Sequence, residues 1–126
     1  MHNTTPLALT PPPSDAGELA FLNAWKSGVC LVGIPSWFGI NEIAELDRYH
    51  HIQHLQPRIA TIEKKIREIP LSKAALLAAM VALFNPAEGV KLADKLDLRG
   101  LGHLFLALPE PHRQALSAML LSYRGW

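Results

Sequence analysis

The feature that most limits how this chain can fold is an apolar stripe in its middle third. Six aliphatic residues follow one another at spacings of 3, 4, 3, 4 and 3. They are Ile52, Leu55, Ile59, Ile62, Ile66 and Ile69. Such spacing places side chains on one face of an α-helix, so residues 41–69 are expected to be helical. Pro57 has no amide hydrogen to donate, and we expect a kink or a break near it.

Further helices are expected on both sides of this stripe. The first should span about 15–27, because Asp15 and Glu18 have the spacing of a capping box and Gly28 is placed to end a helix. Residues 29–34 are rich in β-branched side chains but have no strand to pair with, so we expect an extended, buried linker there. Prolines and capping residues divide the rest of the chain into four more helices, at about 72–84, 85–96, 98–108 and 111–124.

The predicted fold is therefore all-α, a compact bundle of about six helices with short connections and a central helix interrupted near Pro57. The 126 residues are 49% hydrophobic and 18% charged, which supplies a core without a metal ion or a disulfide. Residues 1–13 include a Pro-Pro-Pro run and are predicted to form a disordered arm. Residues 14–126 are predicted to form one helical domain.

Composition also narrows the classes of function. Twelve basic and eleven acidic residues give a net charge of +1, which disfavours a phosphate-binding surface. The chain has one cysteine, Cys30, and no visible secretory signal, so a cytoplasmic location is expected. No apolar run approaches the roughly 20 residues that cross a bilayer, and we expect no membrane partner.

Four residues suggest a metal site on one helix face. Asp47, His50, His51 and His54 fall within one arc of a regular helix, and His50 and His54 are one turn apart, as Zn or Ni ligands on a helix must be. The alternative is that these residues form a solvated polar flank, because the sequence shows no second set of ligands elsewhere in the chain. We expect that no cofactor is bound. Of the other histidines, His103 is expected to pack in the core and His112 to be exposed.

A second hypothesis is a small nucleic-acid-binding regulator. Residues 91–104 resemble the helix-turn-helix of bacterial repressors, with Asp97 at the turn position usually held by glycine. The helix that would read DNA in such a motif is nearly all apolar here, which is typical of core material. Lys64, Lys65 and Arg67 form a small basic strip that could contact phosphates.

The leading hypothesis is a protein without enzymatic activity that binds another protein or itself, as an adaptor, regulator or inhibitor. No phosphate-cradling glycine loop or paired-carboxylate constellation points to catalysis. The segments 76–84 and 85–124 can fill a core without the stripe, so part of the stripe could face a partner. Adjacent aromatic residues in a turn can also anchor a partner. The partner-binding candidates are Ile59, Ile62, Ile66, Ile69, Trp37 and Phe38.

Overall fold

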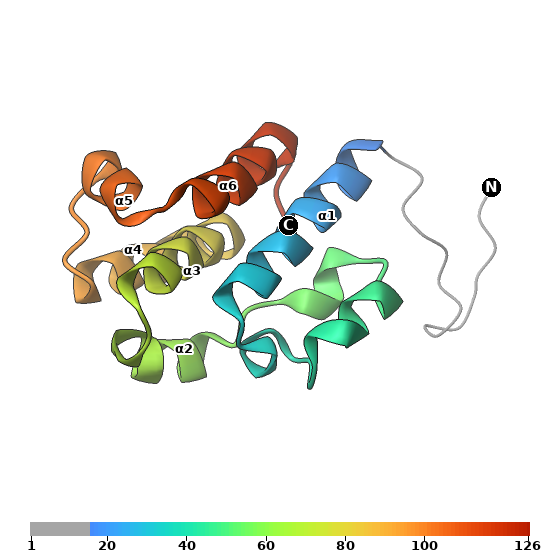
Figure 1. Cartoon of the computed structure of the whole chain (residues 1–126), viewed down its shortest axis with the longest axis horizontal. Coiled ribbons are helices and arrows are strands. Elements are labelled where there is room, and N and C mark those ends of the chain that lie inside the picture. Colours follow the sequence, from blue (N-terminus) through green and yellow to red (C-terminus); the bar gives the residue numbers. More distant parts are fainter. Residues whose placement is uncertain (1–15) are drawn as a thin grey trace.

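The computed structural model describes residues 16–126 (Figure 1), so the predicted arm and the Asp15 cap lie outside the described residues. Within that range the chain is helical and has no β-strand, as the sequence predicts. The α-helices are α1 (Ala16–Val32), α2 (Ile59–Lys65), α3 (Leu71–Phe84), α4 (Pro86–Lys95), α5 (Leu101–Ala107) and α6 (Glu110–Ser122). The 3-10 helices are η2 (Pro35–Phe38), η3 (Ile43–Arg48), η4 (Ile52–Leu55) and η5 (Ile66–Glu68).

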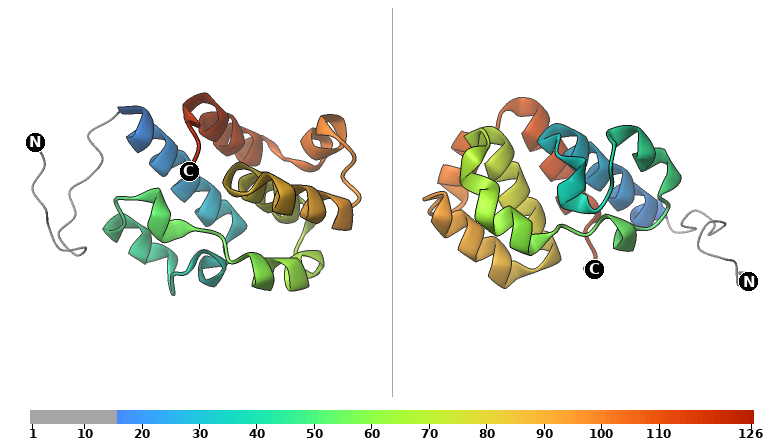
Figure 2. Two further views of the ribbon diagram at one scale, coloured as in Figure 1. Left: turned by 180° about the vertical axis from the view of Figure 1, so that it is seen from behind. Right: turned by 90° about the horizontal axis from the view of Figure 1, so that it is seen from below.

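Helix α3 is the centre of the bundle. Every residue from Ala74 to Ala78 is buried, and so are Met80 and Val81, which occurs only where a helix is covered on nearly all sides. Helices α1, α4, α5 and α6 all contact α3, and α6 also lies along α1 (Figure 2). Buried residues from five of the six α-helices and from the 3-10 segments join in one apolar cluster. No described helix is long and apolar enough to cross a membrane.

Helix α1 is longer than the sequence suggested. Gly28 was predicted to end it and residues 29–34 to be extended, but the helix continues to Val32. Gly28 is instead a packing residue, because a Cβ there would lie 2.5 Å from the Met119 methyl and 2.7 Å from the Met80 sulfur. The helix ends at Gly33, which has a φ of +75°.

The predicted helix over 41–69 is broken into short pieces. Only α2 is α-helical, and Tyr49, His51 and Gln56 have extended backbones between the 3-10 segments. A spacing of three residues also matches the period of a 3-10 helix, which explains why one apolar stripe can persist through irregular backbone. Helicity stops before Pro57, as expected, but it is also lost at 49–51, where no proline intervenes.

The turns around α4 match the sequence in part. Asn85 caps α4 as predicted, accepting a 3.3 Å hydrogen bond from the Glu88 amide, and Pro86 follows at the first helical position. The helix predicted at 98–108 starts later, at Leu101, and Asp97 has a left-handed φ of +58° four residues before it. The intervening Gly100 has a φ of +95°, so two left-handed residues separate α4 from α5.

Candidate interaction surface

The predicted partner-binding residues lie largely inside the chain's own core. Ile62, Ile66 and Phe38 are 0% exposed and Trp37 is 6% exposed. Ile59 and Ile69 are half-buried and pack against the same core. In this conformation α2 and η5 lay their apolar side chains against α3 and η2, so the chain itself covers these residues. Their contact with a partner stays a prediction.

Of the nine large apolar residues that are exposed in the described part of the chain, three lie on α5 and three lie at the end of α6 and just after it, at Leu120, Leu121 and Tyr123. The α5 sequence, Leu-Gly-His-Leu-Phe-Leu-Ala, has five apolar side chains in seven residues, yet none of the seven is buried. Leu101 is 68% exposed, Phe105 is 42% exposed and Leu106 is 82% exposed. These three side chains are termed the α5 surface. Single exposed leucines are ordinary on proteins, but three in one turn and a half of helix form a contiguous patch.

Helix α5 is attached to the bundle at its ends and along one side, where Leu104 and Ala107 are half-buried and pack against the core. Leu98 before it and Leu108 after it are buried. The Arg113 guanidinium of α6 donates a 2.7 Å hydrogen bond to the Leu108 carbonyl and a 2.6 Å bond to the Phe105 carbonyl. Two carbonyls near the C-terminus of α5, where helix carbonyls lack internal partners, are thus satisfied by a cation. This arrangement holds α5 at the edge of the molecule, as Figure 1 shows.

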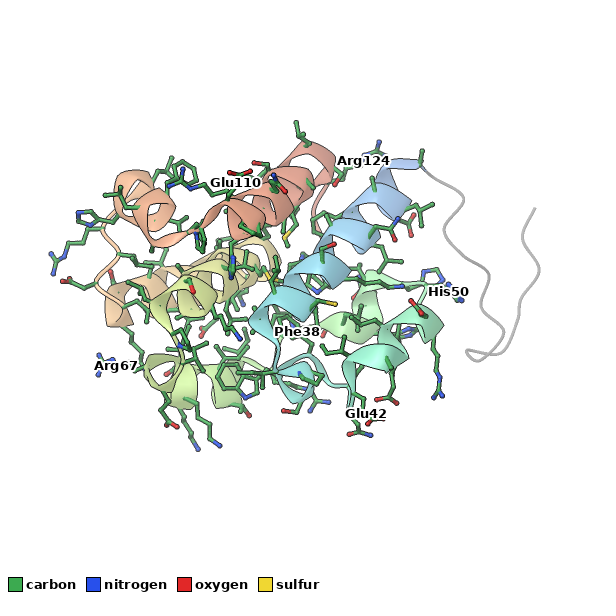
Figure 3. All side chains as sticks on the ribbon, in the orientation of Figure 1. Phe38, Glu42, His50, Arg67, Glu110 and Arg124 are labelled. Carbon is green, nitrogen blue, oxygen red and sulfur yellow. The ribbon has the colours of Figure 1, made fainter. Side chains whose placement is uncertain are left out.

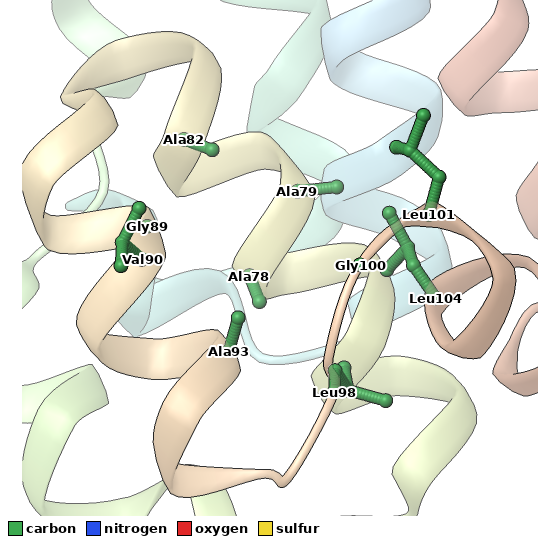
Figure 4. Close-up of a pocket in the computed structure, with 10 residues that line it drawn as sticks. All are labelled: Ala78, Ala79, Ala82, Gly89, Val90, Ala93, Leu98, Gly100, Leu101 and Leu104. Carbon is green, nitrogen blue, oxygen red and sulfur yellow. The ribbon is translucent and has the colours of Figure 1, made fainter.

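An apolar pocket of about 230 Å³ lies where α5 meets α3 and α4 (Figure 4). Its floor is made of small residues because α3 and α4 approach closely: a Cβ on Gly89 would clash with the backbone of Ala82. Leu101 and Leu104 of α5 form one wall. None of the ten lining residues carries a polar side chain: they are Ala78, Ala79, Ala82, Gly89, Val90, Ala93, Leu98, Gly100, Leu101 and Leu104.

A second hollow borders the other flank of α5. It has a volume of about 250 Å³ and is lined by Phe105 of α5 with Leu116, Leu120 and the Arg113 side chain of α6. Leu120 is 53% exposed and extends the apolar surface from α5 onto α6. Pockets for organic ligands usually measure roughly 300–1,000 Å³. A third hollow beside α5, of about 390 Å³ and lined by His103, Leu106 and Ala107, only reaches the lower end of that range. The other two are smaller and match single apolar side chains of a partner better.

Charges stand at the two ends of the α5 surface. Before α5, the Arg99 guanidinium donates a 2.8 Å hydrogen bond to the Asp97 carboxylate, and both side chains are more than three-quarters exposed. Beyond α5, the Glu110 carboxylate accepts a 3.2 Å hydrogen bond from Gln114. Figure 3 shows Glu110 at the start of α6, beside α5. The α5 surface thus has the Arg99–Asp97 ion pair at one end and the Glu110 carboxylate at the other.

The predicted metal-binding face does not form. Asp47 belongs to η3 and His54 to η4, while His50 and His51 lie in the non-α-helical segment between them, so the four side chains do not share one helix face. The His51 and His54 rings are 6.2 Å apart edge to face, and His51 Nδ1 lies 4.0 Å from the Glu18 carboxylate. Across residues 16–126 no group of three or more His, Cys, Asp or Glu side chains is placed to hold a metal ion.

The predicted basic strip is only partly available to a phosphate. Lys64 and Lys65 are exposed at the end of α2. Arg67 is also exposed, but its Nε donates a 3.2 Å hydrogen bond to the Lys95 carbonyl at the end of α4. The Lys95 ammonium in turn donates a 2.7 Å bond to the Glu63 carbonyl. These reciprocal bonds tie the α2–η5 segment to α4, so two of the cations nearby have structural roles.

The structure agrees with one feature of the helix-turn-helix resemblance and disagrees with another. The turn residue Asp97 is left-handed, which is the conformation that favours glycine at that position. The second helix, α5, presents leucine and phenylalanine to solvent, whereas base readout needs polar side chains. Its His103 is exposed, contrary to the prediction, and its Nδ1 accepts a 3.0 Å hydrogen bond from the Arg99 amide.

Two remaining groups have perturbed pKa values. Partial burial raises the pKa of the Cys30 thiol, and the Asp47 carboxylate raises it further, which disfavours the reactive thiolate. His112 was predicted to be exposed but is half-buried, and among the described residues neither of its ring nitrogens has a hydrogen-bond partner. Burial lowers the pKa of His112, and the nearby Lys73 ammonium lowers it further.

No protein-family model, curated protein or solved structure matches this chain. Sequence reasoning assigned residues 98–108 to the core and missed the α5 surface. One feature of the sequence could have indicated this surface. The segment is apolar at most positions, so a helix formed by it must expose apolar side chains if it lies at the surface.

Proposed function

We propose that this protein works by binding another protein, as an adaptor, regulator or inhibitor, and that the α5 surface is its contact site. The observation that carries the proposal is the combination of strong exposure and strongly apolar character in α5. The proposal keeps the type of function expected from the sequence. It moves the contact residues from Ile59, Ile62, Ile66, Ile69, Trp37 and Phe38 to Leu101, Phe105 and Leu106.

The α5 surface leaves apolar side-chain area in contact with water. Full burial of a leucine or phenylalanine side chain gains about 1.5–3 kcal/mol. The three side chains of the α5 surface are still 42–82% exposed, so much of this free energy would be gained only when a partner covers them. Association also has to offset several kcal/mol of lost translational and rotational freedom. The hollows on both flanks of α5 supply further apolar area for inserted side chains. A partner that covers α5 and fills one hollow meets both requirements.

The shape of the surface favours a protein over an organic ligand. A protruding helix with a shallow hollow on each side suits a partner that places side chains on both flanks, as in helix-in-groove recognition. The arginine and glutamate at its ends provide the polar rim that protein interfaces commonly have.

Photochemical cross-linking tests this proposal. Leu106 is replaced by the photoreactive residue p-benzoylphenylalanine and the protein is irradiated in cells of the organism that produces it. The matched control carries the same replacement at Leu121, which is 90% exposed but lies near the far end of α6. We expect covalent protein adducts at position 106 in several-fold excess over position 121.

Equal adduct yields at the two positions would contradict the proposal, because α5 would then be no more engaged than an arbitrary exposed leucine. Mass spectrometry of the peptides in each adduct shows whether the captured protein is a second copy or a different protein.

A further inference from the structure

One glycine of helix α5 meets no packing or backbone requirement from the rest of residues 16–126. All eight glycines lie within residues 16–126. Four have a positive φ, and at three others a Cβ would meet nearby side-chain or backbone atoms. Gly102 is the remaining one: its φ is not positive, and among the described residues nothing lies within 4 Å of the position of a Cβ. Glycine also weakens a helix, so the chain retains a costly residue with no internal reason for it.

Gly102 and Leu106 form a hollow and a projection on the same exposed face. They are four residues apart on α5 and are therefore neighbours on one side of the helix. Leu106 is the most exposed residue of that helix, at 82%. The missing side chain of Gly102 leaves space one helical turn away from the projecting leucine.

We infer that the α5 surface binds a second copy of this chain, with the two α5 helices antiparallel about a two-fold axis. The inference rests on the proposed function and names its partner. In an antiparallel pair centred near Leu104, Leu106 of each copy lies over Gly102 of the other. The arrangement is self-complementary, as a two-fold interface requires. Glycine at the contact lets the two helix backbones approach closely.

The charges at the ends of α5 fit the same arrangement. Arg99 precedes the helix and Glu110 follows it, both with exposed side chains. An antiparallel pair brings Arg99 of each copy toward Glu110 of the other, whereas a parallel pair would bring like charges together. The net charge of +1 adds almost no general repulsion between copies. The Asp97 carboxylate already offsets part of the Arg99 charge, so this contact favours the antiparallel over the parallel orientation and adds only modestly to the strength of association.

The size of the surface points to a reversible dimer. Stable interfaces bury about 800 Å² on each partner, and apolar patches on monomers commonly reach roughly 300–600 Å². The α5 surface consists of three residues, extended by Leu120 on α6, so the contact belongs at the small end of this range. Self-association should depend on protein concentration and lose strength when a single central residue is changed.

Sedimentation equilibrium of the full chain is the first test. The protein is expected to pass from monomer to dimer as its concentration rises. Leu106→Asp should weaken association at least about tenfold, because it places a charge at the centre of the contact. Leu121→Asp is the matched control, since it makes the same change at an exposed leucine away from α5, and it should leave association unchanged. A protein that stays monomeric at millimolar concentration would overturn the inference.

Charge exchange tests the orientation. Arg99→Glu and Glu110→Arg should each weaken the dimer, and the double variant should recover part of the loss, since the charges then match again. Additive losses in the double variant would contradict an antiparallel contact between these residues.

Disulfide trapping tests the contact between Gly102 and Leu106 directly. Cys30→Ser is made first, and Gly102→Cys and Leu106→Cys are then prepared as separate proteins. Both positions are open to solvent, and circular dichroism checks that each variant keeps its helix content. Under mild oxidation the mixture should form cross-linked dimer several-fold faster than either protein alone.

Faster cross-linking within each separate protein would overturn the antiparallel arrangement, since it would place like positions together. The failures of the two proposals are also distinguishable. Photoadducts at position 106 that contain only other proteins would overturn self-association and leave the proposed function standing. Equal adducts at positions 106 and 121 would overturn the proposed function itself.

Discussion

The indole Nε1 of Trp25 donates a 2.9 Å hydrogen bond to the carbonyl oxygen of Leu55, thirty residues away. Both side chains are fully buried. The bond satisfies a carbonyl at the end of η4, where short helical segments leave backbone acceptors without partners. It thus fixes the irregular 49–58 segment against α1.

Replacing Trp25 by phenylalanine should destabilise the protein by about 1–3 kcal/mol beyond the loss of packing, because the buried Leu55 carbonyl loses its donor. Trp126→Phe is the matched control. The two indole rings touch at a centroid distance of 5.0 Å, but Trp126 Nε1 has no hydrogen-bond partner in the described part of the chain. Urea unfolding of both variants measures the difference. Equal losses of stability would show that the hydrogen bond contributes little.

The apolar stripe shows what could be predicted from the sequence and what could not. Its spacing correctly identified side chains that share one direction, since Leu55, Ile62 and Ile66 all reach the core. The spacing could not reveal that the backbone carrying them is mostly 3-10 helix and extended chain, because steps of three residues occur in both kinds of helix. Nor could it decide between the chain's own core and a partner, because both bury the same kind of face.

Ile66→Ala tests the position of the stripe. The side chain is 0% exposed, so its truncation should lower the free energy of unfolding by about 2–5 kcal/mol. Leu121→Ala, at a 90% exposed position, should change it by no more than about 0.5 kcal/mol. Urea unfolding monitored by circular dichroism gives both values. An Ile66→Ala protein of normal stability that fails to associate would restore the stripe as an interface.

The α5 surface was missed for a different reason. An apolar helix is usually covered, and residues 101–107 have the composition of a covered helix. Their exposure follows from how the ends of the helix are attached, through Leu98, Leu108 and the two hydrogen bonds from Arg113. These contacts join parts of the chain whose proximity no local pattern encodes.

The position of His112 predicts a loss of stability in acid. Burial, and then Lys73, lower its pKa in the folded protein below that in the unfolded chain, which is near 6.5. Below that pH the unfolded chain binds a proton that the folded protein binds less readily, so acid favours unfolding. The first turn of α6 also disfavours a cation, since helix N-termini are positive.

The measurement is urea unfolding at pH 7.5 and at pH 5.5. His112→Leu should show a smaller loss of stability between the two values than the unaltered protein, because it removes the titrating group. Lys73→Met should reduce the loss in part by removing one of the two causes of the lowered pKa. An unchanged loss in His112→Leu would assign the acid sensitivity to other groups.

Gly102→Ala separates a helix's own stability from its role in binding. Alanine favours the helical state over glycine by about 1 kcal/mol, and the structure leaves the Cβ position open, so the isolated monomer should become more stable. The same methyl group occupies the space assigned to Leu106 of a second copy, so self-association should weaken. Thermal unfolding at micromolar concentration and sedimentation at high concentration measure the two effects separately. A variant that is more stable and associates as strongly as before would contradict the role assigned to Gly102. Higher monomer stability together with weaker self-association is the result expected if a second copy covers that position.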